Sequence, residues 1–326
     1  MSPRSAFVTG AYGLLGSWLV RALLARGDRV TVLQRDRAPR SALLLDGVAD
    51  AVDVVHGDLV EPGLVARALG EQEVDTVFHL AAQTIVGTAN RSPLGTFESN
   101  VRGTWTLLEA CRLHGARRVV VAASDKAYGA SAELPYREEM ALDPRYPYDV
   151  SKAATDMIAR SYWHTFGLPV AVTRFANLYG GGDLNRSRLI PEAIGAALAG
   201  RAPVIRSDGS PQRDFLYVED AVDAYLRIAD ALDAHADDAP ARGEAFNAGS
   251  GEPRAVRDVV ARICALSGAE VEPDIRGAGT PDGEIDRQWV DASKLRALTG
   301  WAPRVDLDEG LRRTIAWYRA HPQALA

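Results

Sequence analysis

Several features are scarce in this sequence of 326 residues. It has only two cysteines, Cys111 and Cys264, each in a segment with helical periodicity, so it offers no metal-ligand spacing, no redox pair and no disulfide framework. No apolar run reaches the roughly 18 residues that a membrane span needs. No signal-peptide core follows Met1. We therefore predict a cytoplasmic protein with no metal site and no membrane partner.

Strong charge of one sign is also missing. The net charge is −6 at pH 7, and charged residues make up 25% of the chain. A mildly acidic balance argues against nucleic acid as a partner, because that function needs a basic surface. The hydrophobic share of 47% is ordinary for a globular protein. The length exceeds the roughly 250–300 residues at which one core stops growing, so we expect one large domain with a smaller companion.

The N-terminal segment has the pattern of a strand, a glycine turn and a helix. Residues 5–9 form a strand-like run, Gly10, Gly13 and Gly16 follow at spacings of three, and residues 17–26 form an amphipathic helix. Such glycines allow a tight turn, a close approach of backbone N–H groups to a diphosphate, and close packing of the helix on the strand. We predict a dinucleotide-binding turn, with a plain strand-to-helix turn as the alternative. The turn residues predicted to contact the cofactor are Gly10, Tyr12, Gly13, Leu14, Leu15 and Gly16.

The end of a second predicted strand, residues 29–33, bears on which dinucleotide binds. Asp36 would accept hydrogen bonds from a free ribose 2′-hydroxyl, as in NAD. Arg35 and Arg37 would instead pair with a 2′-phosphate, as in NADP. A solvated charged turn is the third alternative. We favour NAD and leave NADP open.

The next two strands add cofactor candidates. After a third strand at residues 52–56, Asp58 could lie beside the adenine ring or could cap the following helix. A fourth strand, residues 76–80, runs into small residues that permit close approach of a cofactor. It contains His79, which we expect to be a core histidine rather than a catalyst. The remaining cofactor candidates are Asp58, Leu59, Leu80, Ala81, Ala82, Gln83 and Asn100, and Gln83 and Thr84 could also face a substrate.

A reaction centre is predicted where the fifth strand, residues 118–123, ends. The three residues that follow carry a hydroxyl, a carboxyl and an amine, and ligands of open α/β sheets bind at this end of the strands. About twenty residues later, a tyrosine and a lysine are spaced i, i+4. In a helix that begins near Pro147, both would project from one face. The five predicted catalytic residues are Ser124, Asp125, Lys126, Tyr148 and Lys152.

The alternation of strands and helices predicts an α/β fold, with a Rossmann-type doubly wound parallel sheet and a smaller C-terminal α/β domain. We place the NAD(P)-binding domain at residues 1–176 and the second domain at residues 177–326, with some chain crossing back to the first. A continuous helix is expected at residues 93–114 because apolar residues recur there at helical spacing. This helix and the one at residues 148–166 are candidates for the interface of a homodimer.

Three motifs lie in register along nearly the whole chain. They are Thr9-Gly10-x-x-Gly13-x-x-Gly16, Tyr148-x-x-x-Lys152 and Arg213-Asp214-Phe215-x-Tyr217-Val218-x-Asp220. On these motifs the chain resembles an extended short-chain dehydrogenase/reductase of the NAD-dependent epimerase/dehydratase family. The resemblance implies that the first domain holds NAD(P) and that the second holds a nucleoside-diphosphate sugar.

Within that family, Ser124-Asp125-Lys126 resembles the triplet of sugar-nucleotide 4,6-dehydratases. Epimerases and decarboxylases of the family more often carry Ser or Thr without the following Asp-Lys or Asp-Glu. Local runs at residues 79–83, 180–183 and 188–191 look most like those of CDP-glucose 4,6-dehydratase. The resemblance implies conversion of a nucleoside-diphosphate hexose to its 4-keto-6-deoxy form. A 4-epimerase that uses NAD is the alternative, and a non-catalytic dinucleotide-sensing module is a more remote one.

The dehydratase interpretation gives each residue a role. Tyr148, its phenolate stabilised by Lys152 and by the oxidised nicotinamide, would deprotonate the sugar 4-hydroxyl, to which Ser124 would hydrogen-bond. Lys126 would take the proton from carbon 5, and Asp125 would protonate the hydroxyl that leaves carbon 6. Guanidinium groups suit bidentate contact with the diphosphate. The predicted substrate contacts are Gln83, Thr84, Ser124, Asn177, Arg188, Leu189, Arg213 and Arg287, with Glu284 near Arg287 in a loop that could close over the ligand.

Overall fold

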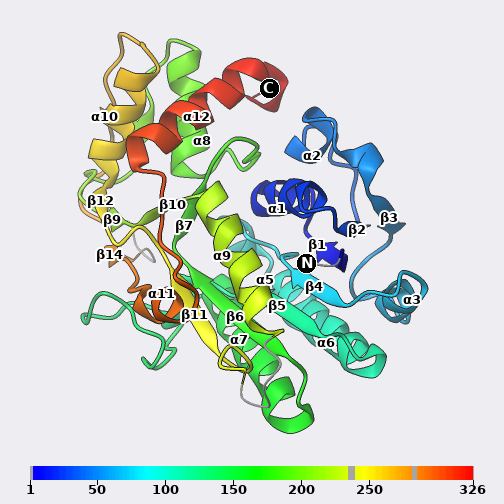
Figure 1. Cartoon of the computed structure of the whole chain (residues 1–326). Coiled ribbons are helices and arrows are strands. Elements are labelled where there is room, and N and C mark those ends of the chain that lie inside the picture. The colour runs from blue at the N-terminus through cyan, green and yellow to red at the C-terminus, as the bar shows by residue number, and fades with distance from the viewer. Residues whose placement is uncertain (1–2, 234–238, 281–284, 326) are drawn as a thin grey trace.

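The computed structural model describes residues 3–233, 239–280 and 285–325. Its main feature is a sheet of seven strands, each hydrogen-bonded in parallel to its neighbours (Figure 1). The strands are β1 (Ser5–Thr9), β2 (Arg29–Gln34), β3 (Asp53–His56), β4 (Thr76–His79), β5 (Arg118–Ala122), β6 (Val170–Phe175) and β11 (Ala245–Ala248). Their order is β11-β6-β5-β4-β1-β2-β3, so the direction of winding reverses between β1 and β4. Ligands of such sheets bind at this reversal.

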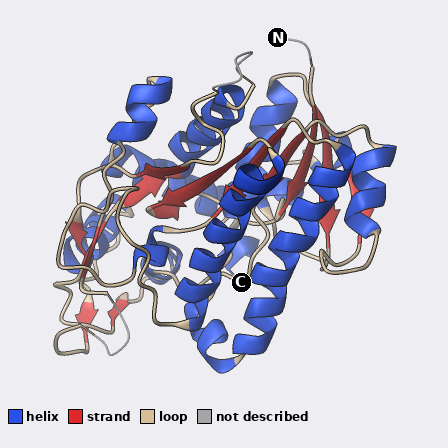
Figure 2. Ribbon diagram, turned by 90° about the horizontal axis from the view of Figure 1, so that it is seen from below, coloured by secondary structure: helices blue, strands red, loops and turns tan. Residues whose placement is uncertain are grey.

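Helices cover both faces of the sheet, which explains why most of its strands are apolar along their whole length. One face is covered by α3 (Leu64–Glu71), α6 (Gly103–His114) and α7 (Pro147–Phe166). The other is covered by α1 (Leu14–Ala25), α9 (Val218–Ala231) and α11 (Ser293–Thr299). Figure 2 shows the sheet between these two helical layers. The predicted doubly wound Rossmann-type fold is confirmed.

A smaller region packs beside the carboxyl ends of the strands. Its core joins α8 (Leu189–Leu198), α10 (Val256–Leu266) and α12 (Leu307–Ala320), seen together at the upper left of Figure 1. Its short strands are β7 (Asn177–Tyr179), β8 (Val204–Ile205), β9 (Gln212–Arg213), β10 (Phe215–Tyr217), β12 (Arg254–Ala255), β13 (Asp274–Ile275) and β14 (Arg287–Gln288). The predicted smaller α/β unit is therefore present. The short elements that complete the chain are α2 (Ala42–Leu45), η1 (Ala49–Ala51), α4 (Val86–Arg91), α5 (Pro93–Phe97), η2 (Glu98–Arg102), η3 (Asp125–Tyr128) and η4 (Pro322–Leu325).

Two details refine the sequence-based expectations. Residues 177–326 return repeatedly to the large sheet, since β11 is its edge strand and both α9 and α11 pack on its face. The predicted helix at 93–114 is present, but it is not a regular α-helix along its whole length. A turn of π-helix, η2, separates α5 from α6. Periodicity did not reveal this turn because the extra residue of a π-helix shifts the apolar stripe only locally, and such turns occur often at functional sites.

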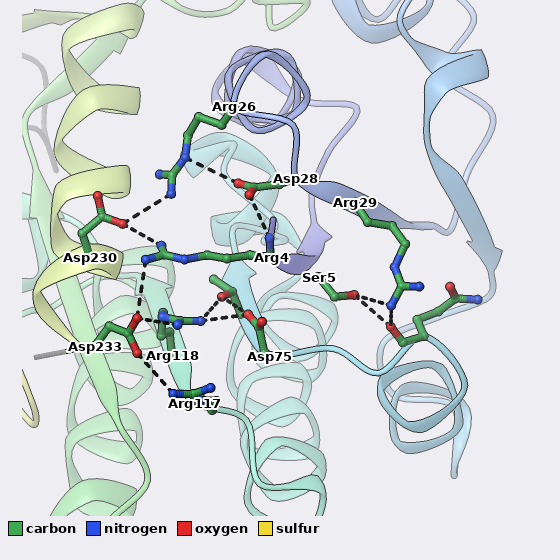
Figure 3. Close-up of polar contacts among 12 residues, drawn as sticks. Arg4, Ser5, Arg26, Asp28, Arg29, Asp75, Arg117, Arg118, Asp230 and Asp233 are labelled. Carbon is green, nitrogen blue, oxygen red and sulfur yellow. Dashed lines mark hydrogen bonds and ion pairs between the residues drawn. The ribbon is translucent and has the colours of Figure 1, made fainter. Parts of the chain in front are cut away.

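A polar cluster fastens α9 to the amino ends of the strands (Figure 3). The side chain of Arg118, which is 5% exposed, donates to Asp75 Oδ1 at 2.9 Å and to Asp233 Oδ2 at 2.6 Å. Arg4 Nη1 donates to Asp230 Oδ1 at 2.6 Å. This cluster lies at the amino ends of the strands, whereas ligands of such sheets bind at the carboxyl ends. We therefore assign it a structural role. Among the described residues, no helix is both long and apolar enough to cross a membrane.

Candidate active site

A cavity of about 1290 Å³ opens at the carboxyl ends of β1, β4 and β5. One side is lined by the turn after β1, by the segments that follow β4 and β5, and by the start of α7. The other side is lined by residues around β7, α8 and β9. The sheet and the smaller region therefore enclose it together, at the position that the topology predicts for a ligand.

The three glycines of the first turn have three different roles. Gly10 has a φ of 74°, and a Cβ there would lie 2.7 Å from the backbone nitrogen of Ala81. A Cβ on Gly16 would lie 2.1 Å from the Gly10 carbonyl oxygen, so this glycine lets α1 pack on β1. A Cβ on Gly13 would meet no protein atom closer than 3.4 Å. Gly13 is also the N-cap of α1 and lines the cavity. Open space over unpaired helix N–H groups fits a dinucleotide diphosphate.

The residues predicted to meet the adenosine lie together at one end of the cavity. Arg35 Nε donates to Asp36 Oδ2 at 2.7 Å, and both side chains are exposed and line the cavity. Asp58 also lines it, and its Oδ1 accepts from the backbone of Val60 at 3.1 Å. It does not cap α3, whose N-cap is Gly63. Asp36 could bind a ribose 2′-hydroxyl and Arg35 could bind a 2′-phosphate. Their pairing at the end of β2 therefore leaves both NAD and NADP as alternatives.

One predicted cofactor contact does not face the cavity. Asn100, on η2, is 1% exposed, accepts from the backbone nitrogen of Gln83 at 2.6 Å and donates to its carbonyl oxygen at 3.1 Å. It also donates to Ser151 Oγ at 2.8 Å. Asn100 therefore holds the segment after β4 against α7. The other predicted cofactor residues that line the cavity are Tyr12, Leu14, Leu15, Leu59, Leu80, Ala81, Ala82 and Gln83.

Tyr148 and Lys152 project together into the cavity from the first turns of α7. Lys152 Nζ donates to the Ala122 carbonyl oxygen at 2.8 Å, and burial lowers the pKa of Lys152 to about 8. Burial raises the pKa of Tyr148 to about 12, although the charge of Arg188 and a hydrogen bond with Ser124 act in the opposite direction. Loss of the Tyr148 proton therefore requires more positive charge beside the ring.

Asp125 is the most unusual group at this site. It is 4% exposed, and burial raises its pKa to about 7 even though the charge of Lys126 acts against this. Ser124 Oγ donates to Oδ1 at 3.1 Å, and Oδ2 is buried with no hydrogen-bond partner among the described residues. Buried polar atoms nearly always have a partner. The carboxyl of Asp125 can therefore be a proton donor near neutral pH, with one oxygen available to a ligand.

His79 is a core residue, as predicted. It is 2% exposed, and its ring lies between the hydroxyls of Thr9 and Thr104, with Nδ1 at 2.9 Å and Nε2 at 3.1 Å from them. Burial lowers the pKa of His79 to about 3, so the ring is neutral. This histidine joins β1 and β4 to α6 and does not line the cavity.

All but one of the predicted substrate residues line the cavity. Arg188 Nη1 donates to Asp183 Oδ2 at 3.1 Å, and its charge reaches Tyr148. Arg213 Nη1 donates to the carbonyl oxygen of Asp286 at 3.0 Å. Both arginines line the part of the wall formed by the smaller region. The other predicted substrate residues that line the cavity are Gln83, Thr84, Ser124, Asn177 and Leu189.

Arg287 lies away from the cavity wall. Its Nε donates to Gln212 Oε1 at 3.2 Å, and its guanidinium lies over the ring of Trp289 at 5.0 Å. Pairing of β14 with β9 directs it to the exposed side. Glu284, predicted to lie near it in a closing loop, is outside the described residues.

One group on the cavity wall was not predicted. Asp149, in the first turn of α7, is 5% exposed and lines the cavity next to Tyr148. Acids are common in the first turn of helices, where the helix dipole favours them, so Asp149 could not be distinguished from an ordinary helix-start residue.

Comparison with known proteins identifies relatives over the whole length. A model of the NAD dependent epimerase/dehydratase family matches residues 6–249. The chain is 30% identical over 330 residues to a trifunctional UDP-glucose 4,6-dehydratase/UDP-4-keto-6-deoxy-D-glucose 3,5-epimerase/UDP-4-keto-L-rhamnose-reductase of Arabidopsis thaliana. This match covers 99% of the chain and 48% of the relative, so the chain spans about half the length of that protein. It is 33% identical over 323 residues to UDP-glucose 4-epimerase of Mycolicibacterium smegmatis, covering 97% of the chain and 99% of the relative.

Solved structures give a similar result. A dTDP-glucose 4,6-dehydratase of Streptomyces venezuelae, solved with NAD bound, matches with a TM-score of 0.86 and 31% identity over 98% of both chains. A dehydratase and an epimerase are thus about equally similar to this chain. These relatives are named for UDP and dTDP sugars, so the predicted likeness to CDP-glucose 4,6-dehydratase in particular finds no support in them. The family model matches residues 6–249, and one cavity is lined by the glycine turn, Tyr148 and Lys152. The chain therefore belongs to the NAD dependent epimerase/dehydratase family.

Proposed function

We propose that this protein is a nucleoside-diphosphate-sugar 4,6-dehydratase that converts an NDP-hexose to an NDP-4-keto-6-deoxyhexose. The proposal rests above all on Asp125, a carboxyl whose pKa of about 7 keeps it partly protonated at neutral pH, with an unpartnered oxygen beside the cavity. A dehydratase needs such an acid because the hydroxyl on carbon 6 leaves readily only when it is protonated. An enzyme that only inverts carbon 4 has no use for it.

The first step is oxidation at carbon 4. Bound NAD, for which the glycine turn has room, would accept hydride from carbon 4. After water is lost, it would return this hydride to carbon 6 while a proton adds to carbon 5, which gives the 4-keto-6-deoxy product. Its oxidised ring would also add positive charge near Tyr148. Tyr148 takes the proton from the 4-hydroxyl, while Lys152 stabilises the phenolate. Lys152 is held in place by its 2.8 Å hydrogen bond to the Ala122 carbonyl oxygen. Ser124 hydrogen-bonds the same hydroxyl and so orients it.

The second step is loss of water between carbons 5 and 6. The ketone at carbon 4 makes the proton on carbon 5 acidic, and Lys126 removes it. Asp125 donates its proton to the hydroxyl on carbon 6, which leaves as water. The two residues are neighbours at the start of η3, so they act on adjacent carbons of one sugar.

The smaller region would hold the nucleotide. Arg188 and Arg213 line its side of the cavity and suit contact with the diphosphate, and Asn177 on β7 lines the same side. We propose NAD as the cofactor, since Asp36 can accept hydrogen bonds from the ribose. The pairing of Asp36 with Arg35 leaves NADP as the alternative to compare in the same assay.

The decisive experiment is incubation of the purified protein with CDP-, UDP-, dTDP- and GDP-hexoses and either dinucleotide, followed by mass spectrometry. One sugar should lose one water. If every sugar keeps its mass while the protein binds the dinucleotide, the dehydratase proposal is wrong.

A 4-epimerase is the second candidate, because Tyr148 and Lys152 serve both reactions and an epimerase is equally similar in sequence. An epimerase would leave the mass of the sugar nucleotide unchanged and would produce a new isomer of the sugar. Chromatography of the same incubations would detect this isomer. Asp125→Asn separates the two chemistries further. It should abolish water loss, whereas an epimerase should keep near-normal turnover.

We also infer that the protein forms a homodimer through α6 and α7, which pack against each other on the outside of the sheet. Apolar side chains that are exposed on this face and on α5 support the inference, because a large exposed apolar patch usually marks an interface. They are Leu94, Trp105, Leu113, Met157 and Phe166.

A further inference from the structure

A buried arginine lies behind the cavity and has no part in the proposed reaction. Arg174 is on β6 and is 1% exposed. Its strand neighbours Thr173 and Phe175 line the cavity, whereas Arg174 does not. Successive side chains of a strand point to opposite faces, so the guanidinium lies on the face of the sheet that α7 covers. Arg174 therefore does not contact a ligand in the cavity.

The guanidinium joins two elements that carry reacting groups. Its Nε and Nη2 donate to the two carboxylate oxygens of Asp156, on α7, at 2.7 and 3.0 Å. Its Nη1 donates to the hydroxyl of Tyr128, the last residue of η3, at 3.0 Å. That hydroxyl donates in turn to Asn247 Oδ1 at 2.8 Å, so it is held from both sides. A two-pronged contact of this kind fixes orientation as well as distance.

Each partner of the arginine lies close along its helix to a reacting group. Asp156 follows Lys152 by one turn of α7 and Tyr148 by two turns, so the three side chains share one face. Tyr128 follows Asp125 by three residues in η3, a 3-10 helix in which residues three apart lie one above the other. The guanidinium thus connects the helix of the Tyr-Lys pair to the turn that carries the acid.

Stability alone does not account for this contact. Apolar residues of similar volume can often replace a buried ion pair without any loss of stability. The proposed reaction, by contrast, places strict demands on geometry, because a displacement of about 1 Å can lower the rate about 100-fold. A buried network with all its partners in place makes the packing of η3 against α7 more rigid.

We propose that Arg174 is a positioning residue that holds Asp125 in a fixed place relative to the Tyr-Lys pair by fixing η3 against α7. It acts through Asp156 and Tyr128 and touches no reacting atom itself. The inference rests on the proposed function, because only dehydration needs Asp125 as an acid.

The test compares two buried arginines. Arg174→Lys keeps the charge but loses the two-pronged contact. Arg118→Lys makes the same change at the amino ends of the strands, where the arginine bonds to Asp75 and Asp233. Urea unfolding measures the loss of stability in each variant, so that activity is compared where both are folded. Only Arg174→Lys should lower kcat, by about tenfold or more, with KM changed less than about twofold, because alignment is lost and binding is kept.

Hydrogen exchange followed by mass spectrometry tests the anchoring without turnover and without a bound ligand. In and after η3, the backbone N–H groups of Ala127 and Gly129 are hydrogen-bonded to residues three before them, both at 3.1 Å. These amides should exchange about tenfold faster in Arg174→Lys than in the wild type, because the turn opens more often. In Arg118→Lys their exchange should be unchanged.

Tyr128→Phe removes the hydroxyl that links the guanidinium to η3 and keeps the ring. It should lower kcat as well, and its combination with Arg174→Lys should lower kcat no further than Arg174→Lys alone, since both remove one link. If Arg174→Lys does not fold, as judged by circular dichroism, Tyr128→Phe takes its place in both measurements.

An unchanged kcat in the folded variant, or an unchanged exchange of η3, would overturn the proposal. An equal fall of kcat in Arg118→Lys would also overturn it, because the effect would then be that of any buried arginine. A protein that dehydrates no sugar but shows the faster exchange of η3 would refute the proposed function and keep the anchoring by Arg174.

Discussion

At the scale of single residues, Asp125 links burial to pH dependence. Its raised pKa means that the carboxyl is protonated below a pH of about 7 and ionised above it. Since the proposed role requires the proton, turnover should fall about tenfold for each pH unit above that point. The measurement is kcat against pH under saturating substrate. A turnover that rises steadily between about pH 7 and about pH 8 would contradict the role.

His79 gives a second prediction, about stability. Its pKa is about 3 in the folded protein and 6.5 as an ordinary histidine, so the unfolded chain binds the extra proton between these values. The contribution of His79 to stability is complete above a pH of about 6.5 and is lost as the pH falls. His79→Gln lowers the free energy of unfolding, and this loss should be about 2 kcal/mol smaller at a pH of about 5 than at a pH of about 6.5.

Urea unfolding of the wild type and of His79→Gln at several pH values measures this loss of unfolding free energy. Asp125 and the other buried acids have pKa shifts of the opposite sense, but they are present in both proteins and cancel in the difference. A cost that is independent of pH would show that His79 titrates normally.

Local spacing made some site residues predictable and left others hidden. Tyr148 and Lys152 could be found because an i, i+4 pair on a helix needs no knowledge of the rest of the fold. Arg287, predicted as a substrate contact, does not line the cavity, and the pairing of β14 with β9 decides which side it faces. The sequence did not reveal that Asn100 holds the segment after β4, or that Asp149 lines the cavity. Their contacts depend on how distant segments meet.

At the scale of elements, the first five strands of the sheet were recognised because each is a short apolar run between turns. The seventh, β11, was missed. It has only four residues, and its pairing with β6 is what makes it a strand. The sheet thus depends on a segment from the far end of the chain.

The cluster of Figure 3 should contribute measurably to that long-range attachment. Asp233→Ala removes a partner of Arg118, whose side chain is 5% exposed, and leaves part of that charge unpaired. We expect the free energy of unfolding to fall by about 1–3 kcal/mol, at the lower end because Asp233 itself is partly exposed. Asp258→Ala breaks an exposed ion pair with Arg257 and should cost less than about 0.5 kcal/mol. Equal effects of both substitutions in urea unfolding would rule out a special contribution of the cluster.

At the scale of the whole molecule, the cavity exists only because two regions meet. The glycine turn and the catalytic helix come from the large sheet, while Arg188 and Arg213 come from the smaller region. Because α9, β11 and α11 return to the sheet, the two regions are tied together by several crossings of the chain rather than by one linker. This arrangement favours a site of fixed geometry, which a reaction that moves hydride and protons on adjacent carbons requires.

Assembly is the last property at this scale. In a symmetric dimer each interface residue is buried twice, so Met157→Glu would bring two carboxylates into one apolar contact, at a cost of several kcal/mol. Met157 is 65% exposed on α7, and glutamate is a good helix former, so the monomer should stay folded. Light scattering should then give about twice 35.0 kDa for the wild type and 35.0 kDa for the variant. Ile275→Glu, at an exposed apolar residue of the smaller region, should remain dimeric. A wild type that is monomeric at micromolar concentration, or a Met157→Glu protein that is still a dimer, would show that α6 and α7 do not form the interface.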